Sequence, residues 1–346
     1  MRVGMVINYA GEFSQVVEEL GDFERAGLDI VFVPEAYTFD AVSQLGFIAA
    51  RTSRLQLASG ILPIYSRTPA LTAMTAAGLD FVSGGRFILG IGTSGPQVIE
   101  GWHGVAYDAP VGRTREVIEI CRKVWRRERL EYHGKYYTLP YEGGTGLGKP
   151  IKLINHPVRE RIPIIVAALG PKNVALAAEL AEGWQPIFYF PEKTAEVWAE
   201  PLAEGRAKRA ADLPELDIIA AAPLAIGEDV TGRREFARPV FALYIGGMGA
   251  RGKNFYFDLA CRFGFADEAK KIQDAYLAGR KQEAEALVPA ELLEKTSLIG
   301  PESYIAERIA ALRESGVTTL NVTPLAATHA KRVAAIEKMR DLAGDA

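Results

Sequence analysis

The sequence has little cysteine and no long apolar run, and both absences narrow the possible classes of protein. Its two cysteines, Cys121 and Cys261, stand far apart and form no CxxC pattern, which argues against a disulfide-built scaffold and favours a reducing compartment. The longest strongly apolar run, Ile218 to Ile226, contains Pro223 and is too short to span a bilayer. The first residues, MRVGMVINYAGEF, have no apolar signal core. We therefore expect a soluble protein of the cytoplasm.

The sequence also has almost no excess charge and no pattern typical of a metal or acyl-transfer site. Forty lysines and arginines against 43 acidic residues leave a net charge of -3, so we expect neither nucleic acid nor a membrane as partner, but a small molecule. No GxSxG run occurs, and the four histidines show no i,i+4 pair, which predicts no metal site. We infer that the chemistry belongs to a bound cofactor.

What the sequence does contain is an alternation of short apolar runs with longer segments of helical period. The expected strands are 2–7, 29–33, 55–62, 86–91, 164–168, 183–188, 217–226 and 318–322. The expected helices between them are 14–26, 39–52, 68–82, 97–102, 113–127, 172–181, 191–211 and 301–315. Eight βα repeats predict parallel strands that close into a (β/α)8 barrel, the TIM barrel, which needs roughly 250 residues.

The remaining residues form two expected insertions and a tail. Residues 129–161 are rich in glycine, proline and aromatics, and residues 228–295 hold several amphipathic helices. No segment has the composition of a linker between domains. The sequence therefore predicts one barrel domain over residues 1–346.

Two glycine patterns resemble nucleotide motifs without their context. Gly90, Gly92 and Gly95 form GxGxxG after a strand, but no second strand with an acidic end follows, which argues against a Rossmann site. A loop at this end of a barrel strand still favours ligand contact, so the candidates are Thr93, Ser94, Gly95 and Gln97. The other interpretation is a flexible turn. The GxxxxGK run at 143–149 is followed by proline where a phosphate loop needs Ser or Thr, and it predicts an insertion loop.

Four segments together resemble the bacterial luciferase-like superfamily, in particular its branch that uses the deazaflavin coenzyme F420. They are ASGILPIYSRTP at 58–69, LDFVSGGRFILGIGTSGPQVIEGWHG at 79–104, PIIVAALGPKNVALAAELAEGW at 163–184 and GVTTLNVTP at 316–324. The resemblance implies a (β/α)8 barrel that commonly forms a homodimer. It also implies hydride transfer between the deazaflavin and a small organic substrate. The alternatives are a monooxygenase that uses FMN and a non-catalytic barrel that binds flavin or deazaflavin.

The resemblance also implies where the cofactor lies. The end of the third strand, Ser59, Gly60 and Ile61, is expected behind the ring, with a cis peptide bond between Gly60 and Ile61. The loop after the fifth strand opens a helix, and free backbone N–H groups together with a lysine favour a phosphate there. Its residues are Ala168, Leu169, Gly170, Pro171 and Lys172. The other interpretation of this loop is an ordinary helix start.

Candidate substrate contacts come from the ends of the first three strands, where a barrel keeps its chemistry. They are Asn8, Tyr9, Glu35 and Tyr65. In the sugar-phosphate branch of the family a histidine follows the acidic residue, whereas here PEAYTF places Ala36 after Glu35. We therefore do not expect sugar-phosphate oxidation. Glu35 is the candidate proton carrier, and the alternative is a carboxylate that caps the next helix or pairs with an arginine.

Overall fold

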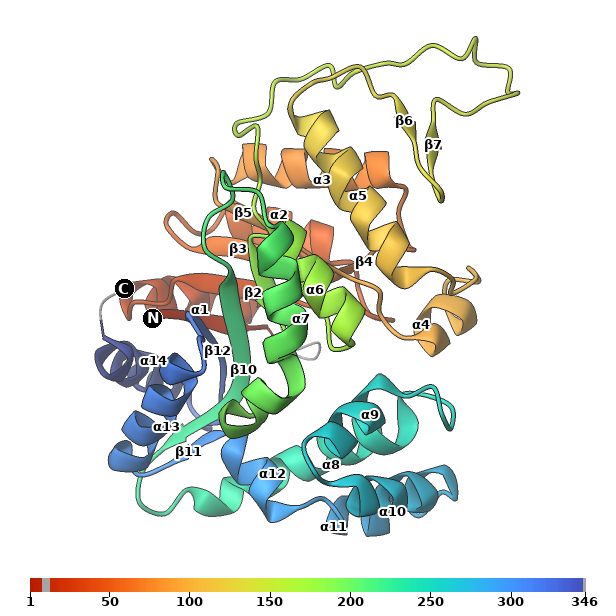
Figure 1. The fold of residues 1–346 in the computed structure, drawn as a ribbon. Coiled ribbons are helices and arrows are strands. Elements are labelled where there is room, and N and C mark those ends of the chain that lie inside the picture. The colour runs from red at the N-terminus through yellow and green to blue at the C-terminus, as the bar shows by residue number, and fades with distance from the viewer. Residues whose placement is uncertain (8–12, 345–346) are drawn as a thin grey trace.

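The computed structural model describes residues 1–7 and 13–344, and its centre is a closed barrel of parallel strands (Figure 1). Following the hydrogen-bonded order around the barrel, the strands are β1 (Arg2–Val6), β2 (Ile30–Val33), β3 (Gln56–Ser59), β5 (Phe87–Gly92), β8 (Ile164–Ala167), β9 (Gly183–Gln185), β10 (Asp217–Ile226) and β12 (Thr319–Pro324). Strand β12 pairs with β1 and closes the ring. The expected (β/α)8 barrel is confirmed. We call the end where the carboxyl ends of the strands lie the mouth.

Alternating side chains of the strands build two cores. Ile30, Phe32, Ala58, Ile165 and Ile219 are among the buried residues that pack together inside the barrel. The intervening residues pack outward against the helices. This division follows from the two-residue period of a strand, and it explains why strands covered on both faces are almost continuously apolar.

The helices cover the outside of the barrel. They are α1 (Phe13–Arg25), α2 (Ala41–Ala49), α3 (Pro69–Val82), α4 (Pro96–Gly101), α5 (Pro110–Trp125), α6 (Pro171–Leu180), α7 (Thr194–Lys208), α13 (Glu302–Glu314) and α14 (His329–Ala343). The expected strands and helices agree with these bounds to within three residues at each end. Three features were not expected: the C-terminal helix α14, strand β11 (Leu298–Gly300) beside β10, and a break in the third strand before β4 (Leu62–Pro63).

The two insertions differ in structure. Residues 129–161 contain the hairpin of β6 (Tyr132–His133) and β7 (Thr138–Leu139), followed by a long loop at the upper right of Figure 1. Residues 228–295 contain α8 (Arg238–Ala242), a π-helical turn (Leu243–Gly247), α9 (Phe255–Arg262), α10 (Ala266–Leu277), α11 (Lys281–Ala286) and α12 (Ala290–Lys295). No helix within residues 1–7 and 13–344 is both long and apolar enough to cross a bilayer.

Candidate active site

The third strand ends in a bulge that presses against β5. Ala58 pairs with Ile88, but Leu62 pairs with Ile91, so β3 and β4 carry one residue more than β5 over the same length. The peptide bond between Gly60 and Ile61 within this bulge is cis, as the resemblance implies.

Gly90 is required by the same bulge. The hydroxyl of Ser59 donates to the carbonyl of Gly90 at 2.8 Å and accepts from its N–H at 2.9 Å. A Cβ on residue 90 would overlap the carbonyl oxygen of Ser59, and a Cβ on Gly92 would lie 3.1 Å from the Ile61 side chain. The first two glycines of the GxGxxG run are therefore explained by strand packing, as the missing dinucleotide context suggested.

The loop after β5 connects the barrel to the second insertion. Thr93 accepts a hydrogen bond from the hydroxyl of Tyr107 at 3.1 Å, and Ser94 has a left-handed backbone with φ 56°. In the amide orientation that satisfies both partners, Gln97 donates to the carbonyl of Met248 at 3.2 Å and accepts from the N–H of Gly249 at 3.0 Å. The predicted loop thus has defined protein contacts on both sides.

The loop after β8 leaves the N-terminus of α6 without a side-chain cap. Gly170 is the N-cap residue, Pro171 begins the helix and Lys172 is exposed. The carbonyls just before the helix are already bound: Trp184 donates to the carbonyl of Ala168, and the carbonyl of Leu169 accepts from Trp198 at 3.1 Å and from Arg262 at 3.0 Å. Pro171 has no N–H, and the N–H groups of Asn173 and Val174 bind the carbonyl of Gly170, so the first turn presents the N–H of Lys172 and the positive end of the helix dipole at the mouth.

Glu35 is held by both contacts that the alternative interpretation named. Arg67 donates to its two carboxylate oxygens at 2.6 and 2.9 Å, and the N–H of Ala41 donates to the second oxygen at 2.8 Å. The side chains of Glu35 and Arg67 are only 8% and 14% exposed. The carboxylate therefore joins the loop after β2 to the loop after β4 and caps α2, which is compatible with a positioning role.

Tyr65 lies in an aromatic group beside the same loops. Its hydroxyl donates to the carbonyl of Asp108 at 2.7 Å, and its ring centre lies 5.3 Å from that of Tyr107. Burial raises the pKa of Tyr65, so the phenol keeps its proton at neutral pH. The other two substrate candidates, Asn8 and Tyr9, lie outside the described residues.

Sequence reasoning missed three amide side chains whose oxygen is buried and has no hydrogen-bond partner among residues 1–7 and 13–344. They are Asn173 on the first turn of α6, Gln185 at the end of β9 and Asn321 on β12. Buried polar groups are normally satisfied, so an orphan oxygen at a mouth or inside a barrel is compatible with a polar ligand. The sequence signal was present: Gln185 and Asn321 each interrupt an apolar strand.

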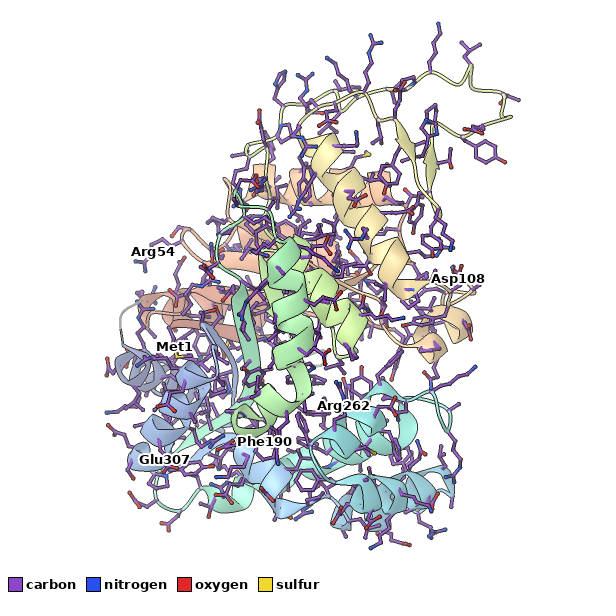
Figure 2. All side chains as sticks on the ribbon, viewed as in Figure 1. Met1, Arg54, Asp108, Phe190, Arg262 and Glu307 are labelled. Carbon is purple, nitrogen blue, oxygen red and sulfur yellow. The ribbon has the colours of Figure 1, made fainter. Side chains whose placement is uncertain are left out.

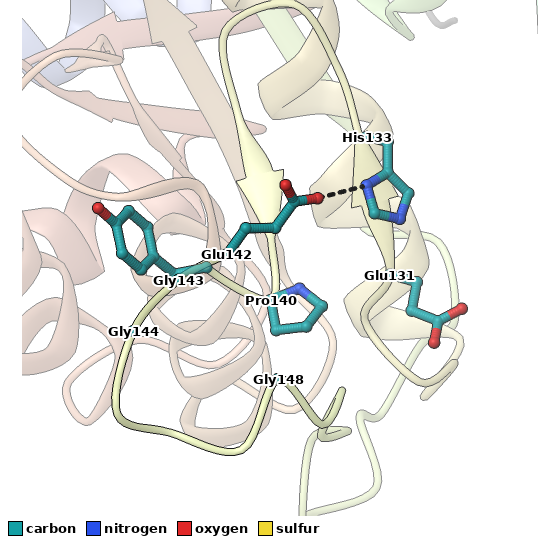
Figure 3. Close-up of a pocket in the computed structure, with 8 residues that line it drawn as sticks. Glu131, His133, Pro140, Glu142, Gly143, Gly144 and Gly148 are labelled. Atoms are coloured by element: carbon teal, nitrogen blue, oxygen red, sulfur yellow. Dashed lines mark ion pairs between the residues drawn. The ribbon is translucent and has the colours of Figure 1, made fainter.

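A hollow lies elsewhere, in the first insertion (Figure 3). It measures about 370 Å³ and is lined by the hairpin and the following glycines, with His133 and Glu142 3.7 Å apart. Both side chains are mostly exposed, and the lining includes no residue from a barrel strand or its following loop. We therefore base the site on the mouth.

Comparison with known proteins agrees with this architecture. The family model of the luciferase-like monooxygenases matches residues 1–319. The chain belongs to this family. It is 40% identical over 343 residues to Rv3520c of Mycobacterium tuberculosis, named as a candidate coenzyme F420-dependent oxidoreductase, and the match covers 97% of this chain and 99% of that protein.

Two further relatives extend the family comparison. A 5,10-methylenetetrahydromethanopterin reductase of Archaeoglobus fulgidus is 30% identical, with 85% of each chain covered. The solved coenzyme F420-dependent tetrahydromethanopterin reductase of Methanopyrus kandleri has the same fold, with a TM-score of 0.79 at 24% identity over 97% of each chain. Together with the family model they confirm the resemblance on which the sequence interpretation rested.

Proposed function

We propose that the protein is a coenzyme F420-dependent oxidoreductase that transfers a hydride between the bound deazaflavin and a small organic substrate. The relatives' names support this function, since 40% identity extends over nearly the whole chain. The structural observation that carries it is the arrangement of three neighbouring strands. The bulge after β3, the loop after β5 and the uncapped helix after β8 lie next to one another at the mouth.

These three features fit the two chemical parts of the cofactor. The bulge at Ser59, Gly60 and Ile61 and the loop of Thr93, Ser94, Gly95 and Gln97 would hold the flat ring. The segment Ala168 to Lys172 would hold the phosphate through N–H groups, the helix dipole and the lysine charge. The bound cofactor supplies or accepts the hydride, and the chain's own residues bind it, orient it and exclude water.

The test is an equilibrium titration of the protein with F420 and with FMN under the same conditions. We expect F420 to bind at least about tenfold more tightly, a difference of about 1.4 kcal/mol. Tight FMN binding without F420 binding would contradict the proposal and favour the monooxygenase. F420 binding without turnover across a panel of alcohols, aldehydes and enones would favour the non-catalytic barrel.

The substrate side of the proposal concerns Asn8, Tyr9, Glu35 and Tyr65. We propose that these residues line the substrate position above the ring. Two roles are open to Glu35: proton carrier, or the positioning role that its bonds to Arg67 and Ala41 support. Single-turnover oxidation of reduced F420 in Glu35→Gln separates them, since loss of the proton carrier slows the step at every substrate concentration. A wild-type rate with lowered stability assigns positioning.

We also propose a homodimer, formed through an exposed apolar stripe on α3. Leu71, Met74 and Phe81 are 46%, 54% and 68% exposed and recur at helical spacing, and Gly78 between them has no neighbouring atom within 4 Å of an added Cβ. A two-fold axis would place this stripe against its copy. We expect Met74→Glu to convert the dimer to monomer in sedimentation, with unchanged far-UV circular dichroism.

We also propose a cytoplasmic location, which the two unpaired cysteines support.

A further inference from the structure

The second insertion is bound to loops on several sides of the mouth. Gln97, after β5, joins its backbone at residues 248 and 249, and Arg262 of α9 donates to the carbonyl of Leu169, after β8. Phe188, three residues after β9, stacks on Phe241 of α8 with ring centres 4.1 Å apart and an angle of 23°. Three consecutive barrel strands therefore contribute contacts that hold this insertion beside the mouth.

One buried side chain fixes two aromatic residues of the insertion. Asn254 is 1% exposed and donates to the carbonyls of Tyr244 and Ile245, both at 2.9 Å. Its oxygen accepts from the N–H of Tyr256 at 2.9 Å, which caps α9. The rings of Tyr244 and Tyr256 consequently meet edge to face, with centres 4.6 Å apart and an angle of 87°.

The π-helical turn that carries Tyr244 is built around a third tyrosine. A Cβ on Gly246 would lie 2.5 Å from Tyr276, and one on Gly247 would collide with the same ring. Both glycines are therefore needed for the turn to lie on α10. Short π-helical segments are frequent at functional sites, and this one carries Tyr244.

Across the mouth, two exposed aromatic residues complete the group. Tyr37 follows β2, Trp102 ends α4, and their ring centres lie 6.5 Å apart. Tyr37 is 60% exposed and Trp102 is 66% exposed. Strands β2 and β9 lie on opposite sides of the barrel, so aromatic residues flank the mouth from both sides.

We propose that this aromatic rim, namely Tyr37, Trp102, Phe188, Tyr244 and Tyr256, selects substrates with a flat, apolar ring system. The inference rests on the proposed function and specifies its substrate class. The rim offers exposed rings at Tyr37 and Trp102 and partly exposed rings at the other three positions, and none of the five side chains is charged. Such surfaces bind conjugated rings by stacking and edge contacts, whereas a sugar phosphate gains little from them.

The fluorescence of one residue provides the test. Of the four tryptophans, Trp125, Trp184 and Trp198 are 0% exposed, so Trp102 is the one that an external ligand can quench directly. The probe is 1,4-naphthoquinone, titrated into the full-length protein without F420 and again with oxidised F420. The non-planar comparison probe is cyclohexanone at the same concentrations.

We expect saturable quenching by 1,4-naphthoquinone, a dissociation constant about three- to tenfold higher in Tyr37→Ala, and no saturable change with cyclohexanone. Tyr141→Ala is the matched control, because Tyr141 lies on the first insertion and is 79% exposed. We expect the Tyr141→Ala variant to bind 1,4-naphthoquinone with the wild-type dissociation constant. Equal dissociation constants for wild type and Tyr37→Ala, or the absence of saturable quenching, would overturn the aromatic rim.

A separate F420 titration, followed by its visible absorbance, distinguishes the two proposals. If naphthoquinone binds and F420 does not, the proposed function fails and the aromatic rim stands. If F420 binds and naphthoquinone does not in either state, the aromatic rim fails and the proposed function stands. Asn254→Asp, which keeps the cap oxygen but loses the two donors to Tyr244 and Ile245, is expected to weaken naphthoquinone binding, because the rings of Tyr244 and Tyr256 lose their fixed arrangement.

Discussion

The two insertions of this barrel bury their apolar residues to opposite degrees. Leu147, Ile151 and Ile154 of the first insertion are 84%, 80% and 88% exposed, whereas Ile245 and Leu259 of the second are almost fully buried. Figure 2 shows the side chains of the first insertion spread along a chain that extends away from the barrel. The second insertion packs as part of the barrel's own core.

The first insertion is nonetheless firmly attached where it leaves and rejoins the barrel. Glu116 of α5, which is buried, accepts hydrogen bonds from the N–H groups of residues 135, 136 and 137 in the hairpin turn. At the other end Arg159 forms an ion pair with Asp80, whose side chain is fully buried. Firm attachment therefore does not by itself place an insertion in the site. An insertion belongs to the site when it contacts the loops at the mouth. The second insertion makes such contacts, with Gln97 after β5 and, through Arg262, with the loop after β8.

The largest expected effect concerns the buried amide of the second insertion. Asn254→Ala removes two hydrogen bonds to carbonyls and the cap of α9, and we expect it to lower the free energy of unfolding by about 2–4 kcal/mol. The matched control is Asn155→Ala, since Asn155 is exposed on the first insertion, with an expected change below about 0.5 kcal/mol. Denaturant unfolding measures both, and equal effects would remove the distinction between the insertions.

A somewhat smaller effect is expected at the hairpin. Glu116→Gln replaces an oxygen that accepts backbone hydrogen bonds with an amide donor, which should cost about 1–3 kcal/mol of folding free energy. Because the hairpin is not placed in the cofactor site, the F420 dissociation constant should stay at its wild-type value. A variant with wild-type stability but weakened F420 binding would contradict this division of roles.

The third prediction concerns the helix start after β8. Gly170→Asp places a carboxylate where the cofactor phosphate is proposed, and repulsion between like charges should weaken F420 binding about tenfold. Gly146→Asp is the control, because an added Cβ at Gly146 in the first insertion meets no atom within 4 Å. Fluorescence titration of F420 gives both affinities. Unchanged affinity in Gly170→Asp would show that this loop is an ordinary helix start.

The smallest effect is expected at the exposed end of the first insertion. Replacing Leu147, Ile151 and Ile154 with serine removes apolar side chains that are already in water, so stability should change by less than about 0.5 kcal/mol each. Thermal unfolding and F420 titration should both match the wild type. A large loss of stability would mean that another surface covers these residues in solution.

The sequence allowed the barrel to be predicted closely because its signals are local. Strand β10 begins and ends at the residues that the alternation of apolar runs predicted. The GxGxxG run was predicted not to form a dinucleotide site, and Gly90 and Gly92 are instead explained by strand packing. Strand β11 was missed because its three residues, Leu298 to Gly300, are too few to show a period and form a strand only through pairing with β10.

The site was harder to predict, for a physical reason. Glu35 could be placed at a strand end, but its partner Arg67 stands 32 residues later and only the folded barrel brings the two together. The same holds for the aromatic rim, whose members come from four segments that share no sequence pattern. Periodicity indicates which face of an element is buried, but it does not indicate which loops meet across a mouth.

Hydrogen exchange of backbone amides with and without F420 tests the central claim most directly, that the second insertion and not the first belongs to the site. We expect F420 to slow exchange in the segments 93–97, 168–174 and 243–256, and to leave exchange in 141–156 unchanged. Protection confined to 141–156, or protection that leaves 243–256 unaffected while 93–97 and 168–174 respond, would contradict the account.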